Sequence, residues 1–198
     1  MPEFDRKILV LFAHPGLENS RCNQALKEAV CEMSGVTFHD LYAVYPDFAI
    51  NVKAEQTLLT DHDAVIFQFP FYWYSTPAIL KEWQDLVLEH GWAYGQEGNQ
   101  LQGKLFGVVT TSGGGPEAYQ RGGYNHYTMN ELLHPLERTA ILCGMRWLLP
   151  FAVQHALTIE DHELVEAAKH YRRYLEAIRD DTLDLNALPE SGLINTFA

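Results

Sequence analysis

The sequence predicts an α/β protein in which helices pack on both faces of a five-stranded parallel sheet. Two observations lead to this fold class. Short apolar runs alternate five times with segments of helical period along the chain, and this alternation is typical of parallel sheets built from βαβ crossovers. The first run, residues 7–13, is apolar from Ile8 to Ala13, as expected of a strand buried on both faces.

The predicted elements follow one another in a regular order. Apolar runs predict strands over residues 7–13, 36–41, 64–69, 104–110 and 145–156, of which the last is imperfect. Apolar spacings of three and four residues predict helices over residues 20–33, 51–60, 78–90, 129–142 and 161–178. Asn51 is a candidate cap of the second helix. The third helix is expected to direct inward Ile79, Leu80, Trp83, Leu86 and Val87.

No repeat, low-complexity tract or linker divides the chain. We therefore expect a single domain over residues 1–180, followed by a tail over residues 181–198. The last twenty residues lack a clear period, and two readings stay open for them: the tail wraps a neighbouring molecule, or it is loose.

The composition indicates an ordinary globular protein, and the net charge limits the classes of partner that it can bind. Of the 198 residues, 47% are hydrophobic and 20% are charged, so one sizeable core is expected. The formal net charge of −12 argues against nucleic acid or anionic lipid as a partner over most of the surface. An anionic ligand must then be held by local groups, such as backbone amides and helix ends.

The cysteines and the first apolar run bear on the compartment. Cys22, Cys31 and Cys143 are odd in number and have no metal-type spacing, so a reduced, intracellular protein without a metal site is expected. The apolar run near the start is six residues long, which is too short for a signal peptide or a membrane span.

The loop after the first predicted strand, HPGLENSRCN (14–23), is a candidate phosphate site. It has neither a GxGxxG pattern nor the lysine of a Walker-type loop. However, Ser20 stands where the helix begins and Asn23 follows three residues later. Free amides at a helix start together with a serine hydroxyl can bind phosphate, and His14 could donate a further hydrogen bond. The alternative is that Ser20 is only a helix cap and His14 a turn residue.

The loop after the third predicted strand, QFPFYWYSTP (68–77), is crowded with aromatic rings. Phe69, Phe71, Tyr72, Trp73 and Tyr74 cannot all face the core from one short segment. They could form a core edge with a hydrophobic dimer surface. They could also form a wall around a flat aromatic cofactor, with the amides of residues 71–74 donating to its heterocycle. A site between subunits would satisfy both interpretations.

The loop after the fourth predicted strand, TTSGGGPEAYQRGGYNHY (110–127), combines glycines with tyrosines and a histidine. Residues 113–115 are glycines, which allow the backbone to approach a ring closely. Tyr119 and His126 form a candidate pair that could protonate a reduced oxygen, because a phenol donates a hydrogen bond and imidazole titrates near neutral pH. The alternative is a solvated, glycine-rich lid.

Three stretches together resemble one family. IFQFPFYWYSTPAILKEW (66–83), FAHP with a serine and an asparagine further on (12–23), and VVTTSGGGPEAYQ followed by MNELLHPLERTAILCGMRWLLP (129–150) resemble the flavodoxin-like NAD(P)H:quinone oxidoreductases, the DT-diaphorase group. FYWYSTP followed by EHGWAYGQEGNQLQGK (89–104) is similar to the bacterial branch that includes ancillary subunits of glutathione-gated potassium efflux antiporters. The resemblance spans roughly residues 7–175.

The resemblance implies a flavodoxin-like three-layer sandwich with strand order 2-1-3-4-5. It implies a homodimeric flavoprotein that passes two electrons as hydride from NAD(P)H to a quinone or another small electrophile. FMN is expected, with FAD as the alternative, because the loop after His14 is longer than in the animal enzymes and matches the bacterial branch. The residues expected around the flavin phosphate are His14, Ser20, Cys22 and Asn23. Those expected to border the isoalloxazine are Pro70, Phe71, Tyr72, Trp73, Tyr74, Thr110, Thr111, Gly113 and Gly114.

The resemblance also assigns catalytic residues and a second reading of function. Tyr119 falls on the family's site tyrosine, whereas His126 lies one position beyond the place of the partner histidine. The second reading is a regulatory subunit that docks on a membrane antiporter, in the cytoplasm at the inner face of the membrane. A single-electron carrier like a true flavodoxin fits less well, since such a protein needs no Tyr–His pair.

Overall fold

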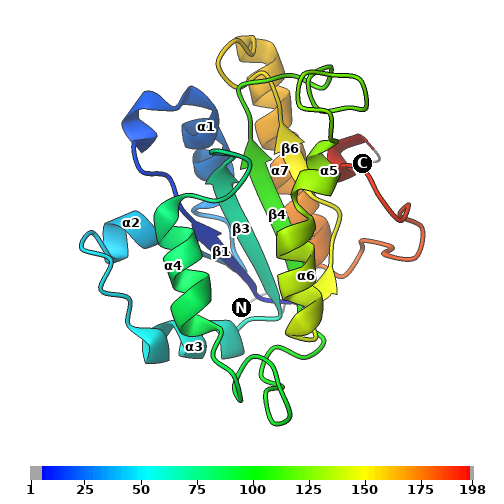
Figure 1. The fold of residues 1–198 in the computed structure, drawn as a ribbon. Coiled ribbons are helices and arrows are strands. Elements are labelled where there is room, and N and C mark those ends of the chain that lie inside the picture. Colours follow the sequence, from blue (N-terminus) through cyan, green and yellow to red (C-terminus); the bar gives the residue numbers. More distant parts are fainter. Residues whose placement is uncertain (1–5, 197–198) are drawn as a thin grey trace.

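The computed structural model describes residues 6–196, and its centre is a parallel sheet (Figure 1). The neighbouring strands run in the order β2-β1-β3-β4-β5, and β6 also pairs with β4. This confirms the order predicted. The strands are β1 (Ile8–Phe12), β2 (Val36–Asp40), β3 (Ala64–Pro70), β4 (Leu105–Thr111), β5 (Arg146–Trp147) and β6 (Phe151–Val153).

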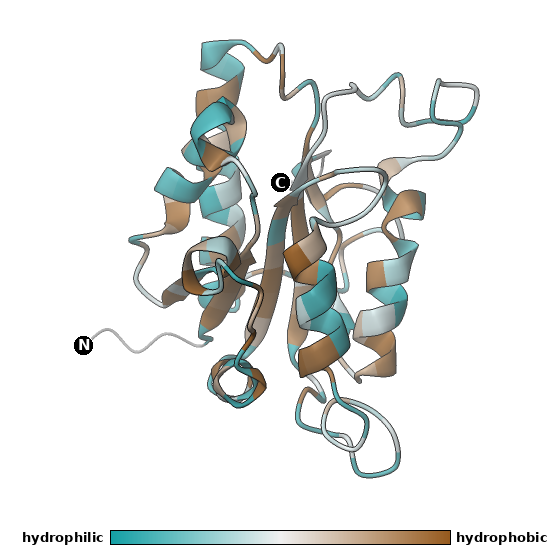
Figure 2. Ribbon diagram, turned by 60° about the vertical axis from the view of Figure 1, so that its left-hand side comes forward, coloured by the Kyte–Doolittle hydropathy of each residue, from teal (hydrophilic) through white to brown (hydrophobic). Residues whose placement is uncertain are grey.

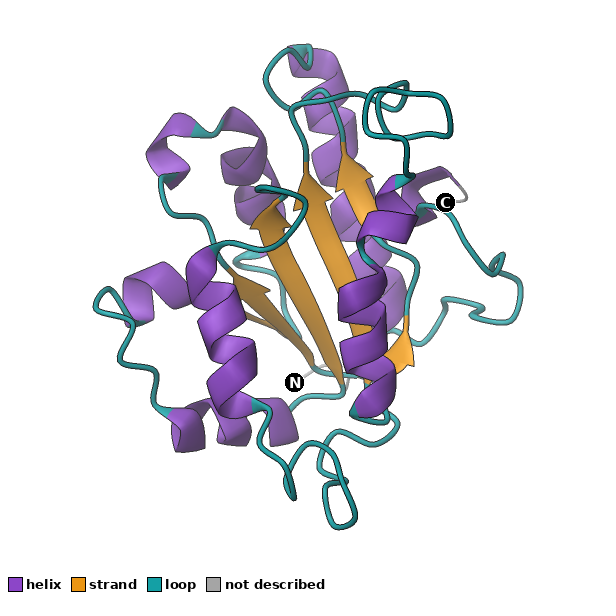
Figure 3. Cartoon of the chain, viewed as in Figure 1, coloured by secondary structure: helices purple, strands orange, loops and turns teal. Residues whose placement is uncertain are grey.

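Helices cover both faces of the sheet, which gives three layers (Figure 3). One face packs against α1 (Arg21–Val30) and α7 (Asp161–Arg179). The other packs against α2 (Leu41–Val44), α3 (Val52–Thr60), α4 (Ala78–Val87), α5 (Met129–Leu132) and α6 (His134–Leu142). Two 3₁₀ turns, η1 (Leu17–Asn19) and η2 (Ile194–Thr196), complete the elements.

The core follows from the apolar runs. Every residue of β1, β3 and β4 is buried, and Figure 2 shows these strands as the hydrophobic centre between more polar helices. Successive strand side chains point to opposite faces. Leu9 and Leu11 therefore join the core under α4 and α6, while Ile8 and Val10 join the core under α1 and α7.

The predicted helix over residues 129–142 is wrong as one element. The chain forms α5 and α6 instead, joined at Leu133. Pro135 lies in the first turn of α6. A proline ring removes an N–H donor and clashes with the carbonyl four residues earlier, so it breaks or kinks a helix at this point.

The predicted fifth strand over residues 145–156 is divided into β5 and β6, which both pair with β4. Pro150 precedes β6 and cannot donate to a strand ladder. The helix predicted over residues 78–90 ends at Val87, and Leu86 is 38% exposed rather than directed inward. The capping prediction is confirmed, because Asn51 Oδ1 accepts from the Ala54 amide at 3.2 Å.

The segment after α7 packs back on its own chain. Leu183, Leu185 and Leu188 lie against the core under α1 and α7, and Ile194 is 1% exposed. The Ile194 amide donates to the Pro150 carbonyl at 2.9 Å. Within residues 6–196, no helix combines the length and hydropathy that a membrane span requires.

A buried carboxylate stabilises the packing of α3 on α4. Glu55 is 1% exposed and accepts hydrogen bonds from Tyr45 Oη at 2.6 Å, Trp83 Nε1 at 2.7 Å and His39 Nε2 at 2.9 Å. Burial by itself raises the pKa of Glu55, but these hydrogen bonds outweigh it and leave the pKa below its ordinary value.

We expect Glu55→Gln to lower the free energy of unfolding at neutral pH by about 2 kcal/mol, since charged hydrogen bonds contribute about 1.5–3 kcal/mol. The depressed pKa means that this stability is present above the unfolded-state pKa of 4.5 and is lost as pH falls through the folded-state value. Urea unfolding from neutral to acidic pH measures both effects. Glu28→Gln, at an exposed position on α1, should change neither the stability at neutral pH nor its loss in acid. If the stability of Glu55→Gln falls with acid as steeply as that of wild type, the prediction is wrong.

Candidate functional site

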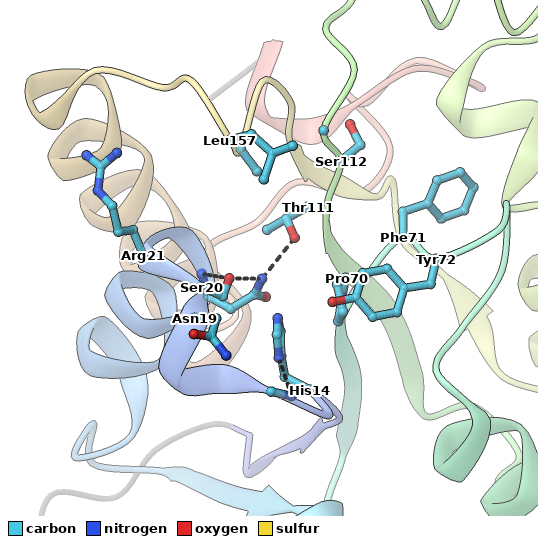
Figure 4. Close-up of a pocket in the computed structure, with 14 residues that line it drawn as sticks. His14, Asn19, Ser20, Arg21, Pro70, Phe71, Tyr72, Thr111, Ser112 and Leu157 are labelled. Carbon is cyan, nitrogen blue, oxygen red and sulfur yellow. Dashed lines mark hydrogen bonds between the residues drawn. The ribbon is translucent and has the colours of Figure 1, made fainter.

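A cavity of about 320 Å³ opens where the loops after β1, β3 and β4 meet (Figure 4). This is the edge formed by the carboxyl ends of the parallel strands. The chain order reverses here, because β1 has β2 on one side and β3 on the other. Open α/β sheets bind their ligands at such a switch point. Each of the three loops that the sequence singled out contributes to the wall.

The first loop presents the start of α1 to the cavity. Ser20 Oγ caps the helix, accepting from the Asn23 amide at 3.3 Å and from Asn23 Nδ2 at 3.0 Å. Asn23 Nδ2 also donates to Thr111 Oγ1 at 2.9 Å, which joins the first and third loops. Amides in the first turn of a helix have no intrahelical acceptor, so those of Arg21 and Cys22 are suited to an anion.

His14 is held as a neutral donor beside this helix start. It is 7% exposed, and its Nδ1 accepts from the Gly16 amide at 3.1 Å. Burial lowers the pKa of His14, although the charges of Glu18 and Asp40 oppose the shift. With Nδ1 accepting, the ring proton lies on Nε2, so the side chain can donate a hydrogen bond.

Arg21 and Leu157, which no sequence pattern singled out, also line the cavity. Arg21 is the first residue of α1, forms an ion pair with Asp161 and donates to the Ile159 carbonyl at 3.5 Å. These contacts tie the start of α1 to the segment before α7. Arg21 could have been predicted from the sequence, because it is a cation in the first turn of the helix. Leu157 could not, since it reaches the cavity only because distant elements pack together.

The second loop divides its rings between the cavity and solvent. Pro70, Phe71 and Tyr72 line the cavity. The Phe71 amide donates to the Thr111 carbonyl at 2.8 Å and the Tyr72 amide to the Pro70 carbonyl at 2.9 Å. Two of the four amides expected to contact a heterocycle are therefore engaged within the protein. Trp73 and Tyr74 have left-handed backbones, with φ of 50° and 61°, and Trp73 is 93% exposed.

The third loop brings backbone close to the cavity. Thr111 and Gly113 line it, whereas Thr110 is buried and donates to the Phe69 carbonyl at 2.9 Å. A Cβ on Gly114 would lie 3.3 Å from the Tyr119 ring, tighter than ordinary contact. Cys22 packs in the core rather than in the cavity wall, and burial raises the pKa of its thiol to about 11.

The structure does not bring Tyr119 and His126 together. Tyr119 is partly buried, its ring lies 6.1 Å from that of Phe71, and burial raises its pKa against the effect of a hydrogen bond with Ser112. His126 is exposed, with φ of 60°. Among the described residues, no hydrogen bond or ring contact joins its side chain to Tyr119. The histidine that packs on the glycine-rich loop is His155, whose amide donates to the Gly114 carbonyl at 3.2 Å.

The cavity fits a phosphorylated flavin by its own chemistry. The helix start and His14 supply donors for a phosphate, against the overall charge of −12. Asn23 Oδ1 is buried and accepts no hydrogen bond within residues 6–196. Such an acceptor needs a donor, and ribityl hydroxyl groups are donors. The fold and site define a class: α/β proteins that hold a nucleotide-like cofactor at the switch point.

Residues 6–175 match a protein family that is described by its flavodoxin-like fold. The chain belongs to this flavodoxin-like family. It is 45% identical over 169 residues to the glutathione-regulated potassium-efflux system ancillary protein KefG of Cronobacter sakazakii, with 85% of this chain and 92% of KefG covered.

Two solved structures share the fold and part of the sequence. General stress protein 14 from Treponema denticola, in complex with FMN, has a TM-score of 0.82 and 35% identity, covering 87% of this chain and 99% of that chain. An NADPH-quinone reductase from P. pentosaceus has a TM-score of 0.78 and 35% identity, covering 85% of this chain and 96% of that chain.

Proposed function

We propose that this protein is a flavoprotein that uses FMN to pass hydride from NAD(P)H to quinones or related electrophiles. The observation that carries the proposal is the cluster of Ser20, Asn23 and Thr111 at the start of α1, with its unpaired Asn23 Oδ1. Similarity to an FMN complex and to an NADPH-quinone reductase supports the same function. When bound, the flavin supplies hydride transfer, which no side chain can perform.

The residues of the first loop hold the cofactor in this proposal. The Ser20 hydroxyl and the amides that begin α1 receive the phosphate, and His14 adds an Nε2–H donor. Asn23 Oδ1 accepts from a sugar hydroxyl. Pro70 and Tyr72 form the opposite wall, and the backbone at Gly113 closes the third side without a side chain.

Tyr119 is the proposed proton donor to the acceptor. Burial raises the pKa of its phenol, so it stays protonated at neutral pH and can donate a proton or a hydrogen bond. Its ring packs beside Phe71, which lines the cavity. His126 is its predicted partner, and this pairing needs either movement of the loop or a second subunit.

The proposal is tested on the purified protein. We expect the absorption bands of a flavin, and release of the chromophore by heat should give FMN on chromatography. With NADPH and a quinone varied together, double-reciprocal plots should give parallel lines, because the two substrates use one site in turn. Protein that stays colourless after incubation with FMN would refute the assignment.

We also propose a homodimer. Trp73 is 93% exposed and Tyr124 86% exposed, and Tyr72, Tyr74 and Tyr127 are exposed in the same two loops. Five exposed rings on two loops that border the cavity are typical of an interface rather than of solvent-facing surface. Trp73→Glu is expected to shift the sedimentation coefficient from that of a dimer to that of a monomer, whereas Val165→Glu, at an exposed apolar position on α7, should not.

Similarity to KefG favours a second function. In this reading the flavoprotein docks on a potassium-efflux antiporter at the cytoplasmic face of the membrane. Co-purification with detergent-solubilised antiporter tests the docking separately from the quinone assay. Recovery of the protein solely from the antiporter-free fraction would contradict it.

A further inference from the structure

The segment after α7 lies beyond the part of the chain that the family match covers. The family match ends at residue 175, and α7 ends at Arg179. KefG is covered over 92% of its own length by 85% of this chain. The described residues beyond α7 nevertheless have defined positions, and Figure 1 shows them returning to α5, beside the loop after β4.

The end of this segment is anchored to the edge of the sheet. Asn195 Nδ2 donates to the Ala152 carbonyl at 2.9 Å, and Asn195 Oδ1 accepts from the Ala152 amide at 3.3 Å. The Ile194 amide donates to the Pro150 carbonyl at 2.9 Å. These bonds satisfy backbone groups on the outer side of β6, which an edge strand would otherwise leave unpaired. They fix the residues just before them, 191–193.

The anchored segment forms one wall of a second cavity, of about 690 Å³. Ser191, Leu193 and Asn195 line this wall, and Tyr119 also lines the cavity. The Tyr119 ring lies 6.1 Å from that of Phe71, which lines the first cavity. The packed rings of Tyr119 and Phe71 therefore lie between the two cavities.

The lining of the second cavity suits a flat ring that carries acceptor oxygens. Apolar surface comes from Met129 and Leu193, and donors come from Asn130 and Gln154. The acidic member, Glu131, is already engaged: it accepts from the Thr128 amide at 2.8 Å and from Thr128 Oγ1 at 3.0 Å, and it forms an ion pair with Arg121. The side-chain amides of Asn130 and Gln154 offer N–H donors, and quinone oxygens, which are acceptors only, can use them.

We propose that residues 191–195 determine acceptor specificity, by enclosing the part of a two-ring quinone that extends beyond the reacting ring. This inference rests on the proposed quinone reductase function. The reacting ring lies beside Tyr119, the proposed proton donor, so a one-ring quinone does not depend on the wall formed by residues 191–195. A naphthoquinone also contacts the wall formed by residues 191–195, so these residues favour the larger acceptor.

The test compares menadione, a naphthoquinone, with 1,4-benzoquinone in the FMN-loaded protein. Ser191→Trp fills the second cavity and leaves Ile194 and Asn195 in place. We expect it to raise KM for menadione about tenfold or more, in the range that hydrophobic pockets discriminate, while kcat/KM for benzoquinone changes less than about twofold. Glu190→Trp is the matched control at the neighbouring exposed position, outside the cavity, and should leave both acceptors unchanged.

Direct binding supplies a second readout. Calorimetry of menadione with the oxidised protein, in the absence of NADPH, should show weaker affinity in Ser191→Trp and in Asn195→Ala, which releases the wall. Equal menadione affinity and KM in wild type and both variants would overturn the inference while the quinone reductase function stands. A wild-type protein that binds FMN and reduces neither quinone would refute the proposed function, and this inference with it.

Discussion

Tyr119→Phe is expected to lower kcat for quinone reduction about a hundredfold, at the lower end of what positioned general acids contribute. The substitution removes one hydroxyl and keeps the ring that packs beside Phe71. The raised pKa of Tyr119 means that the wild-type phenol is protonated throughout the neutral range, so the loss should not depend on pH between about 6 and 8. Steady-state kinetics with NADPH and a quinone measure it.

Two controls separate a chemical effect from a structural one. The affinity for FMN should change less than about twofold in Tyr119→Phe, since the hydroxyl does not line the phosphate side of the first cavity. Tyr124→Phe removes a hydroxyl from an exposed tyrosine in the same loop and should retain full activity. An unchanged kcat in Tyr119→Phe would remove Tyr119 from the catalytic residues.

Ser20→Ala is expected to weaken FMN binding about 10–100-fold. The hydroxyl accepts from the amide and the side chain of Asn23, and in the proposal it also donates to the phosphate. A hydrogen bond to a charged group contributes about 1.5–3 kcal/mol, which corresponds to this loss of affinity. Titration of the apoprotein with FMN, followed by flavin fluorescence, gives the dissociation constant.

The alternative reading of Ser20 as a helix cap makes a different prediction. Loss of a cap alone lowers stability by about 1 kcal/mol. Asn51→Ala removes the cap of α3, away from the cavity, and so reproduces that loss without touching the cofactor site. If Ser20→Ala and Asn51→Ala destabilise the protein equally and both keep wild-type FMN affinity, Ser20 is a cap and nothing more.

The sequence by itself determined the sheet and the location of the site. The continuous apolar runs of β1, β3 and β4 require burial on both faces, and parallel connections then place their following loops on one edge. Ser20 and Asn51 were readable as caps because a cap depends on neighbours within three residues. The break between α5 and α6 also depends on a nearby residue, Pro135, and could have been predicted from the geometry of proline.

Only the tertiary structure decided which loop side chains meet. Trp73, Tyr74 and His126 adopt left-handed backbones, which direct them in ways that no periodicity predicts, because such conformations are held by the surrounding packing. Arg21 reaches Asp161 across 140 positions of sequence, and residues 191–195 reach β6 from a segment without period. Such contacts depend on how distant elements pack, and local patterns carry no information about them.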